Sequence, residues 1–177
     1  QRPGIARSFA QGAQNRKVLV VEDEALLRHH LQPRLGESGH IVDAVPNAEE
    51  ALYQTHEFNH DLAVIDLGLP GISGLETTRR LIQRLPQLRV LFFSMHDELP
   101  LVRQALDAGA AGYITKSSSP QVLVDAVRRT LAGYAYIEQP LATQLARNDV
   151  HDPRLQGMTQ REFEIFVMLA KGTPARV

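Results

Sequence analysis

The 177-residue sequence contains no cysteine. Disulfide bonds, thiolate zinc sites, iron–sulfur clusters and cysteine nucleophiles are therefore excluded. The sequence also lacks any apolar stretch that approaches the length of a membrane span. Charge of one sign is not in excess either, because the formal net charge is −1. A balance this neutral carries no chain-wide signature of nucleic-acid binding, so any DNA-binding surface must be local or lie outside these residues.

The N-terminal segment is polar and lacks the apolar run of a signal peptide. We expect residues 1–16 to be a disordered arm or a remnant of expression cloning. With no leader and no membrane span in the sequence, we expect a cytoplasmic protein without a membrane partner.

Short apolar runs alternate with helical patterns over residues 17–132. The predicted strands are 18–21, 41–45, 62–65, 89–93 and 112–115, and the predicted helices are about 25–38, 48–57, 74–85, 99–108 and 120–131. Five strands alternating with five helices predict an α/β domain with a parallel sheet covered on both faces. The right-handed crossover rule favours a doubly wound sheet, in which the functional site lies at the carboxyl ends of the strands.

Polar side chains follow four of these strands directly. Glu22 and Asp23 follow the first strand, Asp66 the third, Ser94 the fourth and Lys116 the fifth. Carboxylates that converge on one edge of a sheet repel one another, and a divalent cation removes that repulsion. Mg²⁺ prefers oxygen ligands and binds through one or two carboxylates together with phosphate oxygens.

These residues together predict phosphoryl transfer with an aspartate as the acceptor. Asp66 is the predicted nucleophile, and Ser94 would offer a hydroxyl donor. The predicted metal ligands are the carboxylates of Glu22, Asp23 and Asp66 and the backbone carbonyl of Gly68. Lys116 suits a phosphate oxygen. Each residue alone has an ordinary explanation as a turn former, a helix cap or a solvated charge. Acidic, hydroxyl and lysine side chains at four strand ends together favour a functional site instead.

Two segments resemble the receiver domains of two-component response regulators. VLVVEDE (18–24) resembles their first strand and acidic pair, and DLAVIDLGLPG (61–71) is similar to their phosphoacceptor strand and loop. Ser94 stands at the family's Ser/Thr position, Tyr113 at its switch aromatic and Lys116 at its lysine. The resemblance covers about residues 17–131 and implies a CheY-like, flavodoxin-like fold.

The resemblance also implies a function. A histidine kinase or a small phosphodonor would phosphorylate Asp66 with Mg²⁺, after which Ser94 and Tyr113 would switch position. The protein would then control transcription through a C-terminal DNA-binding domain. It would be no enzyme beyond its self-catalysed phosphotransfer and dephosphorylation. A phosphorylation-dependent homodimer is a further expectation.

Three residues depart from the family's common pattern. Glu22 replaces the commoner Asp, although Glu is also frequent there, and Ser73 stands where many members have Asp. Gly68 leaves one side of the site without a side chain, which bears on the lifetime of the phosphorylated state in either direction.

The predicted receiver domain spans residues 17–132, and the C-terminal part of the chain is expected to lie outside it. Residues 133–156 read as a linker with a short helix at about 141–147. Residues 157–177 resemble the first helix of a NarL/LuxR-type helix-turn-helix domain, on MTQRE (158–162) and LAKG (169–172), with Thr159 and Glu162 in a capping box. The recognition helix would follow Val177, so this chain alone is not expected to bind DNA.

HEFNH (56–60) matches the zinc-protease motif H-E-x-x-H. That chemistry needs both histidines on one helix face, but here a helix has to end before the third strand begins. No convincing third ligand follows. The preferred interpretation is a solvated helix end, where a histidine suits the C-terminal dipole.

Two alternatives from other functional classes stay open. An aspartyl-phosphate phosphatase or phosphotransferase of the haloacid dehalogenase type carries a second Asp two residues after its nucleophile, and Gly68 stands there instead. A receiver-like protein-interaction module that works without phosphorylation would not need Asp66, Ser94 and Lys116 together.

Overall fold

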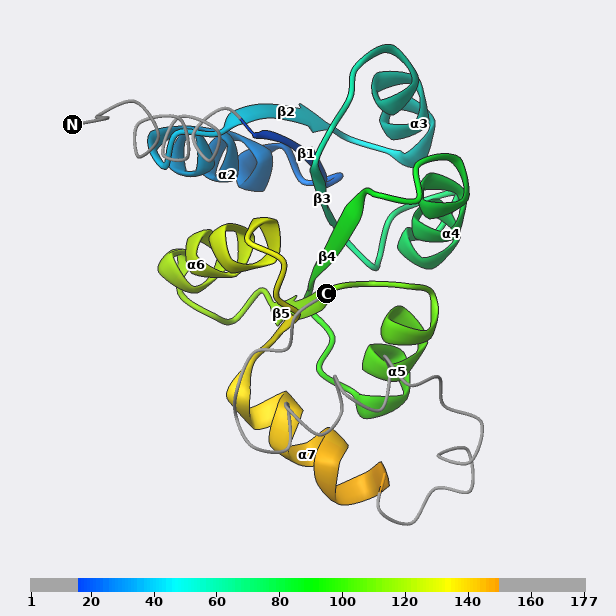
Figure 1. The fold of residues 1–177 in the computed structure, drawn as a ribbon, viewed down its shortest axis with the longest axis vertical. Coiled ribbons are helices and arrows are strands. Elements are labelled where there is room, and N and C mark those ends of the chain that lie inside the picture. Colours follow the sequence, from blue (N-terminus) through cyan, green and yellow to red (C-terminus); the bar gives the residue numbers. More distant parts are fainter. Residues whose placement is uncertain (1–15, 150–177) are drawn as a thin grey trace, which may run out of the picture.

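The computed structural model describes residues 16–149, which form a parallel sheet between two layers of helices (Figure 1). The strand order is β2-β1-β3-β4-β5-β6. The strands are β1 (Lys17–Val21), β2 (Ile41–Val45), β3 (Leu62–Ile65), β4 (Arg89–Ser94), β5 (Gly112–Thr115) and β6 (Tyr136–Ile137). The predicted doubly wound fold is confirmed, with six strands where the sequence predicted five.

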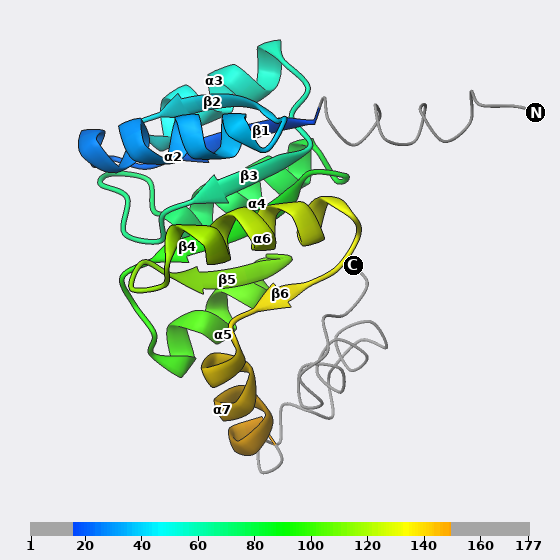
Figure 2. The same ribbon diagram turned by 90° about the vertical axis from the view of Figure 1, so that its left-hand side faces the viewer.

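Helices cover both faces of the sheet, as Figure 2 shows. They are α2 (Ala25–Glu37), α3 (Ala48–Glu57), α4 (Gly74–Arg84), α5 (Leu99–Asp107), α6 (Pro120–Leu131) and α7 (Gln139–Asp149). α2 and α6 lie on one face, and α3, α4 and α5 lie on the other. None of the helices within residues 16–149 is long and apolar enough to cross a membrane.

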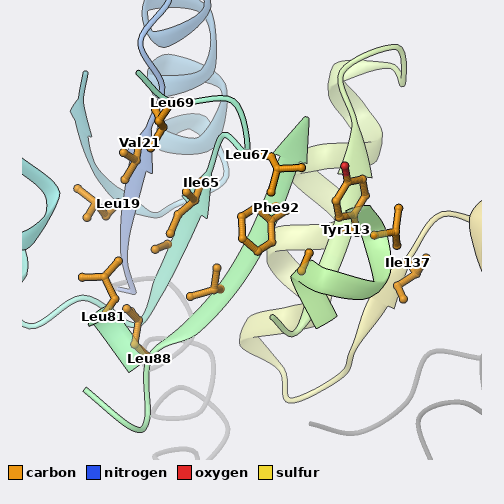
Figure 3. Close-up of a cluster of buried hydrophobic side chains, with 14 of the residues drawn as sticks. Leu19, Val21, Ile65, Leu67, Leu69, Leu81, Leu88, Phe92, Tyr113 and Ile137 are labelled. Carbon is orange, nitrogen blue, oxygen red and sulfur yellow. The ribbon is translucent and has the colours of Figure 1, made fainter. Parts of the chain in front are cut away.

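The strands are apolar on both faces because each face has its own helical layer. Val18 and Val20 of β1 are buried against α2 and α6, whereas Leu19 and Val21 point into the opposite cluster. Successive side chains of a strand point to opposite faces, so one apolar run serves two cores. Figure 3 shows the second of these clusters, around Phe92.

Local capping explains where two helices begin. The Asn47 side chain accepts a hydrogen bond of 2.9 Å from the Glu50 backbone N–H at the start of α3, as its position predicts. The Ser73 hydroxyl accepts one of 3.2 Å from the Glu76 N–H at the start of α4. Ser73, which departs from the family's common Asp, is therefore the N-cap of α4.

The sixth strand corrects the predicted strand count. β6 lies within 133–156, the segment expected to be a linker, and pairs with β5. Two residues are too short to show a strand periodicity, so only the pairing reveals them. The expected short helix is present as the longer α7, which lies beside α5 (Figure 1). The expected arm and the expected helix of residues 157–177 lie outside the described residues, apart from Arg16, and the domain boundaries stay predictions.

Candidate functional site

Three acidic side chains meet at the carboxyl ends of β1 and β3. Val21 and Ile65 are paired in register, so Glu22 and Asp66 leave neighbouring strands side by side. Carboxylate oxygens of Glu22, Asp23 and Asp66 all lie within 4.8 Å of one another. Glu22 and Asp66 are buried and Asp23 is exposed, so the cluster opens to solvent on one side.

The Asp66 carboxylate is held at both oxygens. Its Oδ1 accepts a hydrogen bond of 3.0 Å from the Gly68 backbone N–H, and its Oδ2 lies 3.2 Å from Lys116 Nζ. Its backbone N–H donates to the Val21 carbonyl at 2.9 Å. The carboxylate therefore has a fixed orientation beside the other acids.

Lys116 bridges two of the carboxylates. Its Nζ lies 2.7 Å from Glu22 Oε2 as well as 3.2 Å from Asp66 Oδ2, and its side chain is 10% exposed. Burial by itself lowers the pKa of Lys116, but the hydrogen bond to Glu22 and the charge of Asp66 raise it above its ordinary value. Lys116 is therefore charged at neutral pH.

Burial raises the pKa of Glu22 to about 7, although its hydrogen bond with Lys116 acts in the opposite direction. Three carboxyl groups lie together in this cluster beside the single cation of Lys116. A site with this surplus of negative charge and oxygen ligands suits a hard divalent cation.

Ser94 and Tyr113 meet at the loop that follows β4. Both are fully buried. The Ser94 hydroxyl accepts a hydrogen bond of 3.1 Å from the His96 N–H, and the Tyr113 hydroxyl donates one of 2.6 Å to the His96 carbonyl. Burial raises the pKa of Tyr113. Figure 3 shows the Tyr113 ring between Phe92 and Ile137, in an inward position.

Gly74 is a site residue that the sequence reading missed. A Cβ atom there would lie 2.3 Å from the Asp66 carbonyl oxygen and 2.8 Å from Leu67 Cα. α4 can therefore pass this close to the end of β3, where Asp66 lies, only with glycine at its first residue. The available signal was a glycine opening a helix, a place where it has no conformational advantage over other residues.

The response regulator receiver domain family matches residues 18–128. The chain belongs to this family. This response regulator is 58% identical over 167 residues to the transcriptional activator protein ExaE of Pseudomonas putida. The match covers 90% of this chain and 78% of that protein.

Solved structures of response regulators share the fold. A LuxR-family response regulator from Aurantimonas sp. SI85-9A1 is 35% identical, with a TM-score of 0.71, covering 76% of this chain and 98% of that one. The response regulator TrrA of Thermotoga maritima, solved in complex with Mg²⁺-BeF, is 29% identical with a TM-score of 0.59, covering 66% of this chain and 98% of that one.

The zinc-protease motif does not assemble. His56 is exposed near the end of α3, whereas the His60 side chain is fully buried, with its Nε2 2.8 Å from Asp43 Oδ2 on β2. Because α3 ends at Glu57, His60 lies off that helix. The interpretation as a solvated helix end is wrong for His60, which is a buried partner of Asp43.

Proposed function

We propose that this response regulator accepts a phosphoryl group on Asp66 from a histidine kinase, with Mg²⁺ as cofactor, and thereby controls transcription through a C-terminal DNA-binding domain. The observation that carries the proposal is the Asp66 carboxylate, which lies 3.2 Å from Lys116 Nζ and within 4.8 Å of two further carboxylates. A nucleophile, a phosphate-pairing cation and metal ligands are thus in one place.

The donor set fits Mg²⁺. Glu22, Asp23 and Asp66 would hold the ion, with the Gly68 carbonyl as a further ligand, and the exposed Asp23 leaves room for the waters that Mg²⁺ retains. When bound, the ion supplies positive charge that stabilises the transferring phosphoryl group.

Asp66 is the nucleophile in this proposal. One carboxylate oxygen forms a bond to phosphorus while the P–N bond of the kinase phosphohistidine breaks and the ring nitrogen regains a proton. The Gly68 N–H holds Oδ1 throughout, and Lys116 Nζ can exchange its contact with Oδ2 for a phosphoryl oxygen. Both donors already lie against the Asp66 carboxylate, so they have to move little during the transfer.

The β4–α5 loop would change its hydrogen bonds when Asp66 is phosphorylated. The Ser94 hydroxyl, now bonded to the His96 N–H, would turn to a phosphoryl oxygen, while Tyr113 holds the same loop at the His96 carbonyl. The two states then differ in which bonds this loop makes. Similarity to a transcriptional activator supports gene regulation as the output.

The test is the intact mass of the protein after incubation with acetyl phosphate, with and without Mg²⁺. We expect one added phosphoryl group that requires Mg²⁺ and is absent from Asp66→Asn. Asp107→Asn is the matched control, because Asp107 is exposed at the end of α5 that points away from the site. It should be phosphorylated like the wild type.

Efficient labelling of Asp66→Asn at another residue would contradict the site assignment. No adduct from acetyl phosphate or from a kinase, combined with no Mg²⁺ binding, would favour the interaction module that works without phosphorylation.

A further inference from the structure

The segment after α6 returns to the strand that carries Lys116. β6 pairs with β5 through Gly112 and Tyr136 and through Tyr113 and Ile137. A Cβ atom at residue 112 would lie 2.2 Å from the Tyr136 carbonyl oxygen, so glycine at that position allows this close approach. β6 lies beyond residues 18–128, which match the receiver family.

Glu138, directly after β6, binds the end of β5. Its Oε1 accepts a hydrogen bond of 2.5 Å from the Thr115 backbone N–H, and its two oxygens lie 3.2 and 3.3 Å from the Thr115 hydroxyl. That hydroxyl also lies 2.9 Å from the Ser117 hydroxyl and 3.3 Å from that of Ser118. One carboxylate therefore organises the loop around the neighbouring residue, Lys116.

The peptide that carries Lys116 is held from two sides. On the β4 side, the Lys116 N–H donates to the Ser94 carbonyl at 2.7 Å. On the β6 side, the preceding residue is held by Glu138. The position of a buried lysine ammonium group depends on its backbone as well as on its ion-pair partners. Small displacements of a reacting group reduce reaction rates strongly.

We propose that Glu138 is a positioning residue for phosphoryl chemistry at Asp66: through Thr115 it fixes the strand end that directs Lys116 toward the acceptor. The inference rests on the proposed function. Glu138 touches neither Asp66 nor Lys116 in any contact found within residues 16–149, so it acts through the backbone N–H and the hydroxyl of Thr115.

Variants of Glu138 should keep β6 in place. Ile137, Leu141, Ala142 and Leu145 are buried in the cluster that contains Tyr113, and this apolar contact does not involve the carboxylate. Burial of several such side chains outweighs one hydrogen bond. A single cooperative melting transition in every variant, lowered by no more than a few degrees in Glu138→Ala, would check this.

The experiment measures the rate of phosphorylation by saturating acetyl phosphate at saturating Mg²⁺, in the full chain. Glu138→Ala should slow it by roughly 3- to 10-fold, the range that one net hydrogen bond gives. Glu138→Gln should restore the rate, because an amide oxygen can still accept the Thr115 N–H. Gln139→Ala, at an exposed neighbouring residue, should match the wild type. The Mg²⁺ affinity should be the same in all four proteins.

A double-mutant cycle separates positioning from general stability. In a Lys116→Ala background, Glu138→Ala should have no further effect, since there is no lysine left to position. If that background reacts too slowly to measure, hydrogen exchange of the Thr115 and Lys116 amides replaces the cycle. It should accelerate in Glu138→Ala and be unchanged in Glu138→Gln.

A wild-type rate for Glu138→Ala would overturn the inference, as would an equal slowing with and without Lys116. Absence of phosphorylation in the wild type would instead contradict the proposed function.

Discussion

The two edges of the sheet use the same residue types in opposite ways. At the carboxyl edge, formed by the carboxyl ends of β1, β3, β4 and β5, buried carboxylates face one another around Lys116. At the amino edge, formed by the opposite ends of these strands, Asp61 accepts a hydrogen bond of 2.9 Å from the Lys17 N–H. Arg89 there donates to the Thr130 and Leu131 carbonyls, both at 2.8 Å.

Charged side chains at the amino edge are hydrogen-bonded to backbone groups of the fold. Asp61 satisfies a strand N–H, and Arg89 binds the last carbonyls of α6, where a cation is favoured by the helix dipole. At the carboxyl edge three carboxyl groups gather around one lysine, and burial raises the pKa of Glu22. Under the proposed function, this acidic cluster would gain its compensating charge only when a cation and a phosphoryl group bind, at some cost in stability beforehand.

The largest expected contrast is between Asp66→Asn and Asp61→Asn. The first should abolish phosphorylation, because an amide is not a nucleophile for this reaction, while the second should leave its rate within about two-fold and lower the stability slightly. Intact mass and thermal melting measure both. Loss of phosphorylation in Asp61→Asn with the fold intact would remove the functional distinction between the edges.

Next in size is the contrast between Gly74→Ala and Gly68→Ala. The first should lower the free energy of unfolding by about 3 kcal/mol and impair phosphorylation, because its Cβ would overlap the Asp66 backbone. At residue 68 the new Cβ would lie an ordinary 3.8 Å from Asp66 Oδ1, so little change is expected. Chemical denaturation measures both variants, and equal stabilities would refute the close-approach argument.

The pH dependence of the free energy of unfolding should reveal the raised pKa of Glu22. Its folded pKa of about 7 lies above the ordinary value of 4.5, which applies to the unfolded chain, so the folded protein binds the extra proton. Without Mg²⁺, its contribution to stability is greatest at acid pH and is lost as the pH rises through 7, by about 2 kcal/mol between pH 5 and 7. Denaturation in EDTA at several pH values should show a flatter dependence for Glu22→Gln; identical slopes would contradict the raised pKa.

The smallest effect concerns the amino edge. Arg89→Met should lower the free energy of unfolding by about 1–2 kcal/mol, because two helix carbonyls lose their donor. Phosphorylation kinetics should stay unchanged. A stability equal to the wild type would show that these hydrogen bonds are replaced by water at no cost.

Much of the fold was readable from local pattern. The apolar runs of β1 and β3 predicted buried strands, and the positions of Glu22 and Asp66 directly after them predicted that these two acids lie side by side. β6 was not readable, since Tyr136 and Ile137 have no periodicity of their own. Gly74 was missed because its requirement comes from a close approach to the backbone of Asp66 and Leu67. Glu138 was missed because its hydrogen bonds join it to Thr115, 23 positions earlier in the chain.

The sequence by itself determined the succession of the first five strands and their helices along the chain, because this follows from periodicity. It also determined that acids, a hydroxyl and a lysine stand at strand ends, which the topology of a parallel sheet brings together. Only the tertiary structure decided that Lys116 bridges Glu22 and Asp66, that His60 is buried beside Asp43, and that the expected linker returns to the sheet. Such contacts join residues 17 to 94 positions apart, so they depend on how the layers pack rather than on any local pattern.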